Sequence, residues 1–172
     1  MSRTAAILGS FCFLLLAPGL VAGVVPWWIS GWQIRPPLLG IPGVRIVGVG
    51  FMILGTPLLL DSFARFAIQG LGTPAPIFPT RHLVVTGFYR YVRNPMYLGV
   101  TAVIAGQGLL FGSLRVLEYG AVAWTASCVF VISYEEPKLR ETFGDEYRAF
   151  CRNVPRWVPR LSPWTDNLEG TE

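Results

Sequence analysis

The residues best suited to chemistry lie in two short charged segments beside long apolar ones. The first, GFYRYVRNPMYLG, carries Arg90 and Arg93 immediately before Asn94-Pro95. Asn is a favoured helix N-cap and Pro is favoured at the first helical position, so we expect a helix to begin there. The free N–H groups of a helix start, with the guanidinium of Arg93 beside them, suit a carboxylate or phosphate. The alternative is that both arginines only contact lipid phosphates.

The second charged segment, YEEPKLRETFGDEYRAF, begins with a pair of carboxylates, Glu135 and Glu136. Apolar residues then recur at helical spacing among charged neighbours, which predicts an amphipathic helix lying at a membrane interface. Gly144 would weaken this helix and Pro155 would end it. Its apolar face comprises Leu139, Phe143, Tyr147 and Phe150.

Two apolar segments between the charged ones are expected to bring them together. The first runs about 18 residues from Tyr97, and the second returns over a similar length to Glu135. Each arm would rise about 27 Å, so the hairpin returns the glutamates to the membrane face that carries Arg93. Ala102 and Gly106 are four residues apart and would let the two arms pack closely.

The composition indicates an all-α, polytopic membrane protein. Of the 172 residues, 52% are hydrophobic and 14% charged, and the mean hydropathy is +0.50, which is more apolar than a soluble domain of this size. Four runs poor in charge, residues 4–34, 41–60, 96–114 and 119–134, are candidate spans. The first could instead be a signal peptide, but its apolar length favours a retained helix.

The distribution of basic residues predicts the orientation. A four-span arrangement places eleven of the fourteen Lys and Arg residues on one side and three, Arg35, Arg45 and Arg115, on the other. The crowded side should be cytoplasmic, together with both termini and the candidate site. The net charge of +4 is explained by this bias, with membrane lipids rather than nucleic acid as partners.

A proline-rich segment, GLGTPAPIFPT at residues 70–80, is expected to divide a single domain of residues 1–172 into two parts. Residues 1–69 would form two structural spans, and residues 81–160 the catalytic hairpin and tail. The three cysteines and the single histidine support neither a disulfide framework nor a metal site. His82 alone could contact a ligand or simply be solvated.

Residues 81–160 resemble the isoprenylcysteine carboxyl methyltransferase-like proteins, which are grouped with the membrane phospholipid methyltransferases. The resemblance rests on GFYRYVRNPMYLG, on EEPKLRETFGDEYRAFCRNVPRWVP and, less specifically, on GTPAP. It implies methylation of a lipophilic substrate at the cytoplasmic interface, with S-adenosylmethionine as the cofactor. Better-known eukaryotic members carry Arg-His-Pro where this chain has Arg93-Asn94-Pro95, and an asparagine cannot titrate near neutral pH.

The resemblance places the cofactor among the last two spans and the tail helix. Catalytic roles are expected for Arg93, Glu135 and Glu136. The expected cofactor-binding residues are His82, Gly87, Tyr89, Asn94, Pro95, Tyr97, Gly99, Leu139, Tyr147 and Arg156. Because Arg93 beside a helix start favours an anion over an ammonium group, carboxyl-O-methyl transfer is favoured over N- or S-methyl transfer.

Two other functions remain open. Sterol reductases and related NADPH-dependent membrane reductases end in a similar Arg-x-Pro hairpin, and a non-enzymatic membrane scaffold would need only the anchoring features. The methyl acceptor is also open among isoprenoid acids, thiols and phospholipid amines. The short four-span pattern leads us to expect a bacterial inner membrane.

Overall fold

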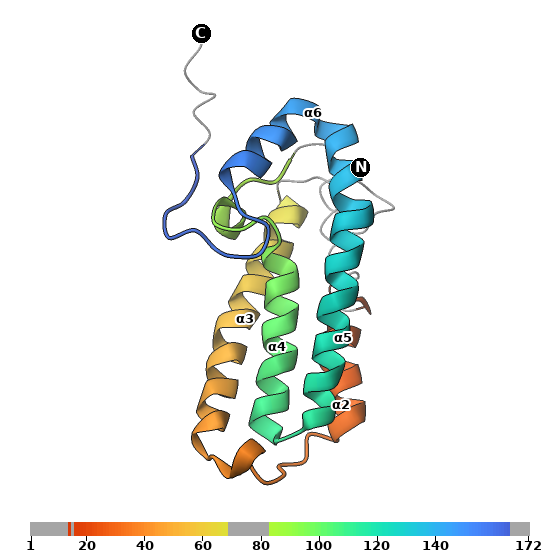
Figure 1. Ribbon diagram of the computed structural model, residues 1–172, viewed down its shortest axis with the longest axis vertical. Coiled ribbons are helices and arrows are strands. Elements are labelled where there is room, and N and C mark those ends of the chain that lie inside the picture. The colour runs from red at the N-terminus through yellow and green to blue at the C-terminus, as the bar shows by residue number, and fades with distance from the viewer. Residues whose placement is uncertain (1–13, 15, 69–82, 166–172) are drawn as a thin grey trace.

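The structure, a computed structural model, describes residue 14 and residues 16–68 and 83–165 (Figure 1). Throughout these ranges the regular secondary structure is helical, which confirms the all-α prediction. The proline-rich segment, His82 and the start of the first predicted span lie outside the described residues. The elements are η1 (Leu20–Val24), α2 (Val25–Ser30), η2 (Leu38–Gly40), α3 (Gly43–Ile68), η3 (Gly87–Arg90), α4 (Pro95–Phe111), α5 (Leu114–Phe130), η4 (Val131–Glu135) and α6 (Glu136–Asn153).

Two helices in the described part of the chain are long and apolar enough to cross a membrane. One is Gly43–Arg65 within α3, and the other is the continuous helix Leu114–Asn153 formed by α5, η4 and α6. Helices Leu20–Ser30 and Pro95–Phe111 are apolar but shorter. The 17 residues of α4 rise about 26 Å, slightly less than a hydrocarbon core of about 30 Å. Two of the four predicted spans therefore meet the length requirement in full.

Helices α3 and α4 lie side by side (Figure 1). They pack through glycines that face each other. A Cβ added at Gly55 would lie 2.9 Å from the carbonyl oxygen of Gly99, and one added at Gly48 would lie 2.7 Å from that of Gly106. Gly48 and Gly55 are seven residues apart on α3, and Gly99 and Gly106 are seven residues apart on α4, so the two glycines of each helix share one face. The predicted close packing at Ala102 and Gly106 therefore occurs, but against α3 rather than α5.

The short helix α2 is fixed to α4 and α5 by side chains that replace missing backbone hydrogen bonds. Val25 N–H donates to the carbonyl of Leu20, as in a π turn, and the next residue, Pro26, has no N–H to donate. The carbonyls of Val21 and Ala22 therefore need other donors. Tyr119 Oη donates to Val21 O at 2.9 Å, and Gln107 Nε2 donates to Ala22 O at 2.6 Å.

Helix α6 crosses the end of the α3–α4–α5 bundle and packs on a small core (Figure 1). Its helical backbone is interrupted at Gly144, where φ is +51° and ψ is −119°, a conformation that only glycine adopts readily. The apolar face of α6 packs on protein, so the location of this helix at a membrane interface stays a prediction. The buried members of this core are Val84, Tyr89, Tyr147, Phe150 and Val154.

Candidate functional site

Glu136 is buried and lies at the centre of a cluster of guanidinium groups. Its side chain is only 4% exposed. Arg156 binds it in a bidentate manner, with Nε 2.6 Å from Oε1 and Nη2 2.9 Å from Oε2. Arg93 Nη1 donates to Oε1 at 3.0 Å, and Arg140 Nη2 donates to Oε2 at 3.3 Å. Three positive groups around one carboxylate leave an excess of positive charge, which suits a second anion. We call Glu136, Arg93, Arg140 and Arg156 the Glu136 cluster.

Arg93 retains donor capacity within this cluster. Its side chain is 11% exposed, and its Nε is buried with no hydrogen-bond partner among the described residues. Nη1 also donates to Cys151 Sγ at 2.9 Å. A buried donor left unpaired costs about 1–3 kcal/mol, so an acceptor atom supplied by a ligand would be favoured there.

The extended segment after α6 holds the first motif in place. Arg93 N–H donates to Pro155 O at 2.9 Å, and Arg160 N–H donates to Tyr91 O at 2.9 Å. Trp164 N–H donates to Arg90 O at 2.9 Å, and Arg90 Nε returns a bond of 2.7 Å to Trp164 O. We call residues 154–164 the strap. Because the strap also carries Arg156, it fixes two of the three guanidinium groups relative to each other.

Asn94 joins the strap to the start of α4. The helix begins at Pro95 as predicted, with Asn94 as the N-cap residue. The capping hydrogen bond expected of its side chain is not formed. Instead, the buried Asn94 Nδ2 donates to Arg156 O at 3.1 Å. The side chain is drawn away from the helix because the strap offers it a backbone acceptor.

A second polar contact links the two arms of the hairpin. Tyr97 Oη, in the first turns of α4, donates to Glu135 Oε2 at 2.7 Å. Glu135 and Glu136 are neighbours in the chain but have different partners, Tyr97 on α4 for one and the guanidinium groups for the other. The predicted return of both carboxylates to the start of α4 is thus observed.

The remaining predicted residues are distributed around these contacts. Tyr89, Tyr147 and Leu139 belong to the core on which α6 packs. Burial, and secondly the negative charge of Glu135, raises the pKa of Tyr89, so its phenol stays neutral. Gly87 has a φ of +56° and lies against the guanidinium of Arg65. Gly99 lies in the contact between α3 and α4. The ligand contacts expected of these residues remain predictions, and His82 lies outside the described residues.

Two members of the site were missed in the sequence. Arg140 lies four residues after Glu136, the spacing at which helical side chains meet, so this pair could have been found. Cys151 lies one turn beyond Tyr147 on the face of α6 that packs on the core. No spacing rule indicates its contact with Arg93, because that contact depends on how α6 crosses the bundle.

In its described part the chain is helical, with two helices long and apolar enough to cross a membrane, and it holds a positively charged cluster around a buried carboxylate at the end of a helical hairpin. A family model described as phospholipid methyltransferase matches residues 44–146, more than half of the chain. The chain belongs to the phospholipid methyltransferase family. This membership confirms the resemblance seen in the sequence, and the matched residues include Arg93, Glu136 and Arg140.

Three curated relatives carry different methyltransferase names. The chain is 35% identical over 97 residues to the phosphatidylethanolamine N-methyltransferase of Laccaria bicolor, covering 55% of this chain and 10% of that protein. It is 30% identical over 138 residues to methanethiol S-methyltransferase 1 of Bradyrhizobium diazoefficiens, covering 74% and 45%. It is 35% identical over 115 residues to the protein-S-isoprenylcysteine O-methyltransferase of Schizosaccharomyces pombe, covering 66% and 48%. The chain thus spans about half the length, or less, of these relatives.

Proposed function

We propose that this protein is an S-adenosylmethionine-dependent methyltransferase that acts on a lipophilic acceptor at the membrane interface. The observation that carries the proposal is the Glu136 cluster, a buried anion-receptive group at the end of a membrane hairpin in a member of this family. The relatives named for N-, O- and S-methyl transfer support methyl transfer as the common chemistry.

The residues of the cluster suit the charged groups of the proposed cofactor. When bound, S-adenosylmethionine would supply a methyl group activated by its sulfonium. Its carboxylate matches the excess positive charge around Glu136 and the unpaired Nε of Arg93. Hydrogen bonding to Glu136 raises the pKa of Arg156, so this guanidinium remains charged. Glu135, held by Tyr97, is the carboxylate suited to the positive portion of the cofactor.

The protein would contribute alignment and exclusion of water rather than acid–base chemistry. An acceptor that is already an anion needs no general base, so the main requirement is to hold it in line with the methyl group. Helix α6 and the strap would close the site from solvent, because they pack on the core and hydrogen bond to residues 90–94. We extend the proposal to a single domain, 1–172, with the cluster and both termini at the cytoplasmic face of a bacterial inner membrane.

The acceptor that we propose first is a carboxylate. The excess positive charge of the cluster attracts an anionic acceptor and repels an ammonium head group. A thiolate is the second candidate, since methanethiol S-methyltransferase 1 aligns with 74% of this chain. Both candidates share an anionic accepting atom.

Titration of the detergent-purified protein with S-adenosylmethionine and, separately, with NADPH tests the proposal. We expect S-adenosylmethionine to bind, with affinity lowered at least about tenfold in Arg93→Gln, because a charge-assisted hydrogen bond contributes about 1.5–3 kcal/mol. Arg148→Gln, which removes an arginine that is 63% exposed, should bind as the wild type does. Binding of NADPH alone would favour a membrane reductase, and binding of neither ligand a scaffold.

The labelled product then identifies the acceptor class. A methyl ester releases labelled methanol in mild alkali, whereas a thioether or methylamine retains its label. A carboxylate with a pKa of about 4 is ionised from pH 6 to 9, so its methylation should vary little over that range. A base-stable product formed faster as the pH rises toward 9 would instead indicate a thiol or an amine.

A further inference from the structure

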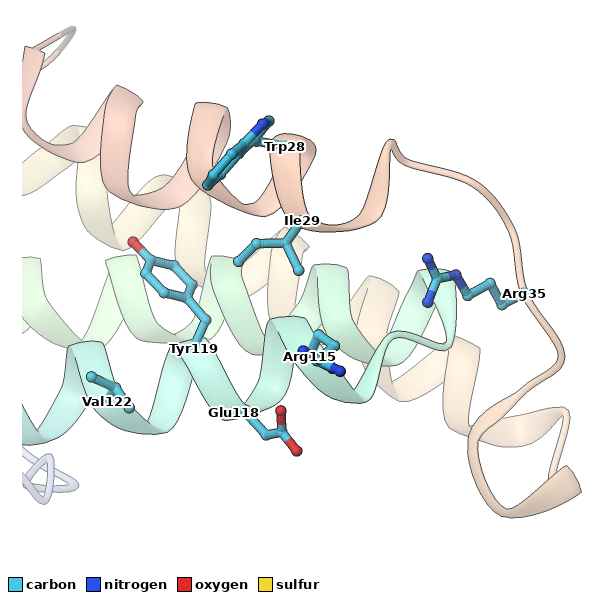
Figure 2. A pocket seen from close by; sticks show the side chains of 7 residues that line it. All are labelled: Trp28, Ile29, Arg35, Arg115, Glu118, Tyr119 and Val122. Atoms are coloured by element: carbon cyan, nitrogen blue, oxygen red, sulfur yellow. The ribbon is translucent and has the colours of Figure 1, made fainter.

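A second polar region lies at the end of the molecule opposite the Glu136 cluster. An open groove with a volume of about 670 Å³ lies between α2, α5 and the segment after α2 (Figure 2). Its size is within the range of small-molecule sites. The residues that line it are Trp28, Ile29, Arg35, Arg115, Glu118, Tyr119 and Val122.

The charged residues of this groove have no ion-pair partner in the described part of the chain. Arg35 lies on the connecting segment, whereas Arg115 and Glu118 lie on the first turns of α5 (Figure 2). All three side chains are exposed. The groove therefore offers two positive groups and one negative group to a ligand, and the start of α5 adds partial positive charge.

The rest of the groove lining is largely apolar and comes from both α2 and α5. Trp28 and Ile29 project from α2, and Val122 lies on α5 one turn beyond Glu118 (Figure 2). Tyr119 is fixed by its hydrogen bond to Val21 O, which ties the two helices together. Trp28 is 81% exposed beside the charged groups, a combination typical of the membrane–water interface.

We propose that this groove binds a zwitterionic phospholipid of the leaflet opposite the Glu136 cluster. Its phosphate would lie between Arg35 and Arg115, its ammonium group against Glu118, and an acyl chain along Trp28, Ile29 and Val122. A free phosphate would leave the apolar wall and Glu118 unused, so the groove fits a lipid better. Arg115 and Glu136 are separated by about 31 Å along the continuous helix, which places a lipid bound here out of reach of the cluster.

Native mass spectrometry of the full chain, without methyl donor and with equal amounts of phosphatidylethanolamine and phosphatidylglycerol, tests this site. We expect the wild type to retain phosphatidylethanolamine about two- to fivefold better than phosphatidylglycerol. An exposed ion pair between Glu118 and the ammonium group would give a difference of this size. Glu118→Gln should remove the preference and keep lipid binding. Arg115→Gln should lower retention of both lipids about two- to fivefold, because this arginine is exposed and solvent screens its contact with the phosphate. Glu141→Gln and Arg148→Gln match these charge changes on exposed residues of α6 and should behave as the wild type does.

A second measurement locates the lipid. Phosphatidylethanolamine with brominated acyl chains should quench the fluorescence of Trp28. The quenched part of the tryptophan fluorescence should therefore be absent from the Trp28→Phe variant. Inorganic phosphate in excess should not displace the lipid. Equal retention of the two lipids by the wild type, unchanged retention in Arg115→Gln, or displacement by inorganic phosphate would each overturn the proposal.

Discussion

At the scale of single residues, the candidate site depends on the charge of Glu136. The ion pairs that Arg93, Arg140 and Arg156 form within the cluster are all made to its two oxygens. Without this carboxylate, the three guanidinium groups would repel one another in a mostly buried space. Glu136 therefore organises the cluster whether or not it also touches a ligand.

We predict that Glu136→Gln lowers methyl transfer by more than about tenfold and destabilises the protein. Removal of one partner from a buried ion pair costs about 3–5 kcal/mol, and a smaller value is expected here because Arg140 and Arg156 are partly exposed. Methyl transfer and thermal unfolding in detergent measure the two effects. The matched control is Glu141→Gln, which breaks an exposed pair with Lys138 on the same helix and should change the stability by less than about 1 kcal/mol. Equal effects of the two substitutions would contradict the central role of Glu136.

The sequence predicted the main pairing of the site but not its full set of contacts. The hairpin argument correctly brought Glu136 to Arg93, because two helical arms of similar length must return to the same end. It could not predict that Asn94 would donate to the strap or that Cys151 would accept from Arg93. Those contacts depend on the path of the chain after α6, and no periodicity specifies that path.

At the scale of helices, the contact between α3 and α4 shows what a small residue does and does not indicate. The presence of Ala102 and Gly106 predicted a close approach, which is observed, but assigned it to the wrong neighbour. The spacing of seven residues shared by Gly48 and Gly55 on α3 and by Gly99 and Gly106 on α4 was the missing signal. Small residues at the same spacing on two helices identify which helices pack together, whereas small residues on one helix indicate only that some helix packs there.

We predict opposite effects from alanine at two glycines of α3. A Cβ at Gly55 would lie 2.8 Å from Ala102 Cβ and 2.9 Å from Gly99 O, so Gly55→Ala should force the helices apart and cost about 1–3 kcal/mol. At Gly50 a Cβ would meet nothing within 4 Å, so Gly50→Ala should stabilise the helix by about 0.5–1 kcal/mol. Thermal unfolding in one detergent compares them directly. A stabilising Gly55→Ala would show that the two helices do not pack in this way.

At the scale of the whole molecule, charged side chains gather at two opposite ends. Helix α6 and the strap lie toward one end of the molecule, and the turn between α4 and α5 lies at the other (Figure 1). The Glu136 cluster belongs to the first end, and the groove with Arg35 and Arg115 belongs to the second. Composition alone was sufficient to predict a helical membrane protein. The number of full spans was harder to predict, because the two arms of the hairpin differ in length. The first arm, α4, has 17 residues, whereas the second runs for 21 residues from Leu114 to Tyr134.

We predict that the two ends lie on opposite sides of the membrane, with the cluster in the cytoplasm. The four-span arrangement predicted from the sequence places eleven of the fourteen basic residues on the side of the cluster, and such an excess is retained in the cytoplasm. Reporter fusions after Glu172 and within residues 112–118 should report a cytoplasmic and an external location, respectively. A cytoplasmic signal from the second fusion would contradict both the topology and the position of the proposed site.

The strap also fixes when the site can be completed during biosynthesis. Residues 90–93 are synthesised well before residues 155–164, yet Arg90 O, Tyr91 O and Arg93 N–H form their backbone hydrogen bonds with that later segment. At about 5–20 residues per second, residues 90–93 are made roughly 3–15 seconds before their partners in residues 155–164. The nascent chain can therefore enter the bilayer with its charged cluster still unassembled. A product truncated before Val154 would contain the residues of all the helices described in the structure and lack the segment that closes the site.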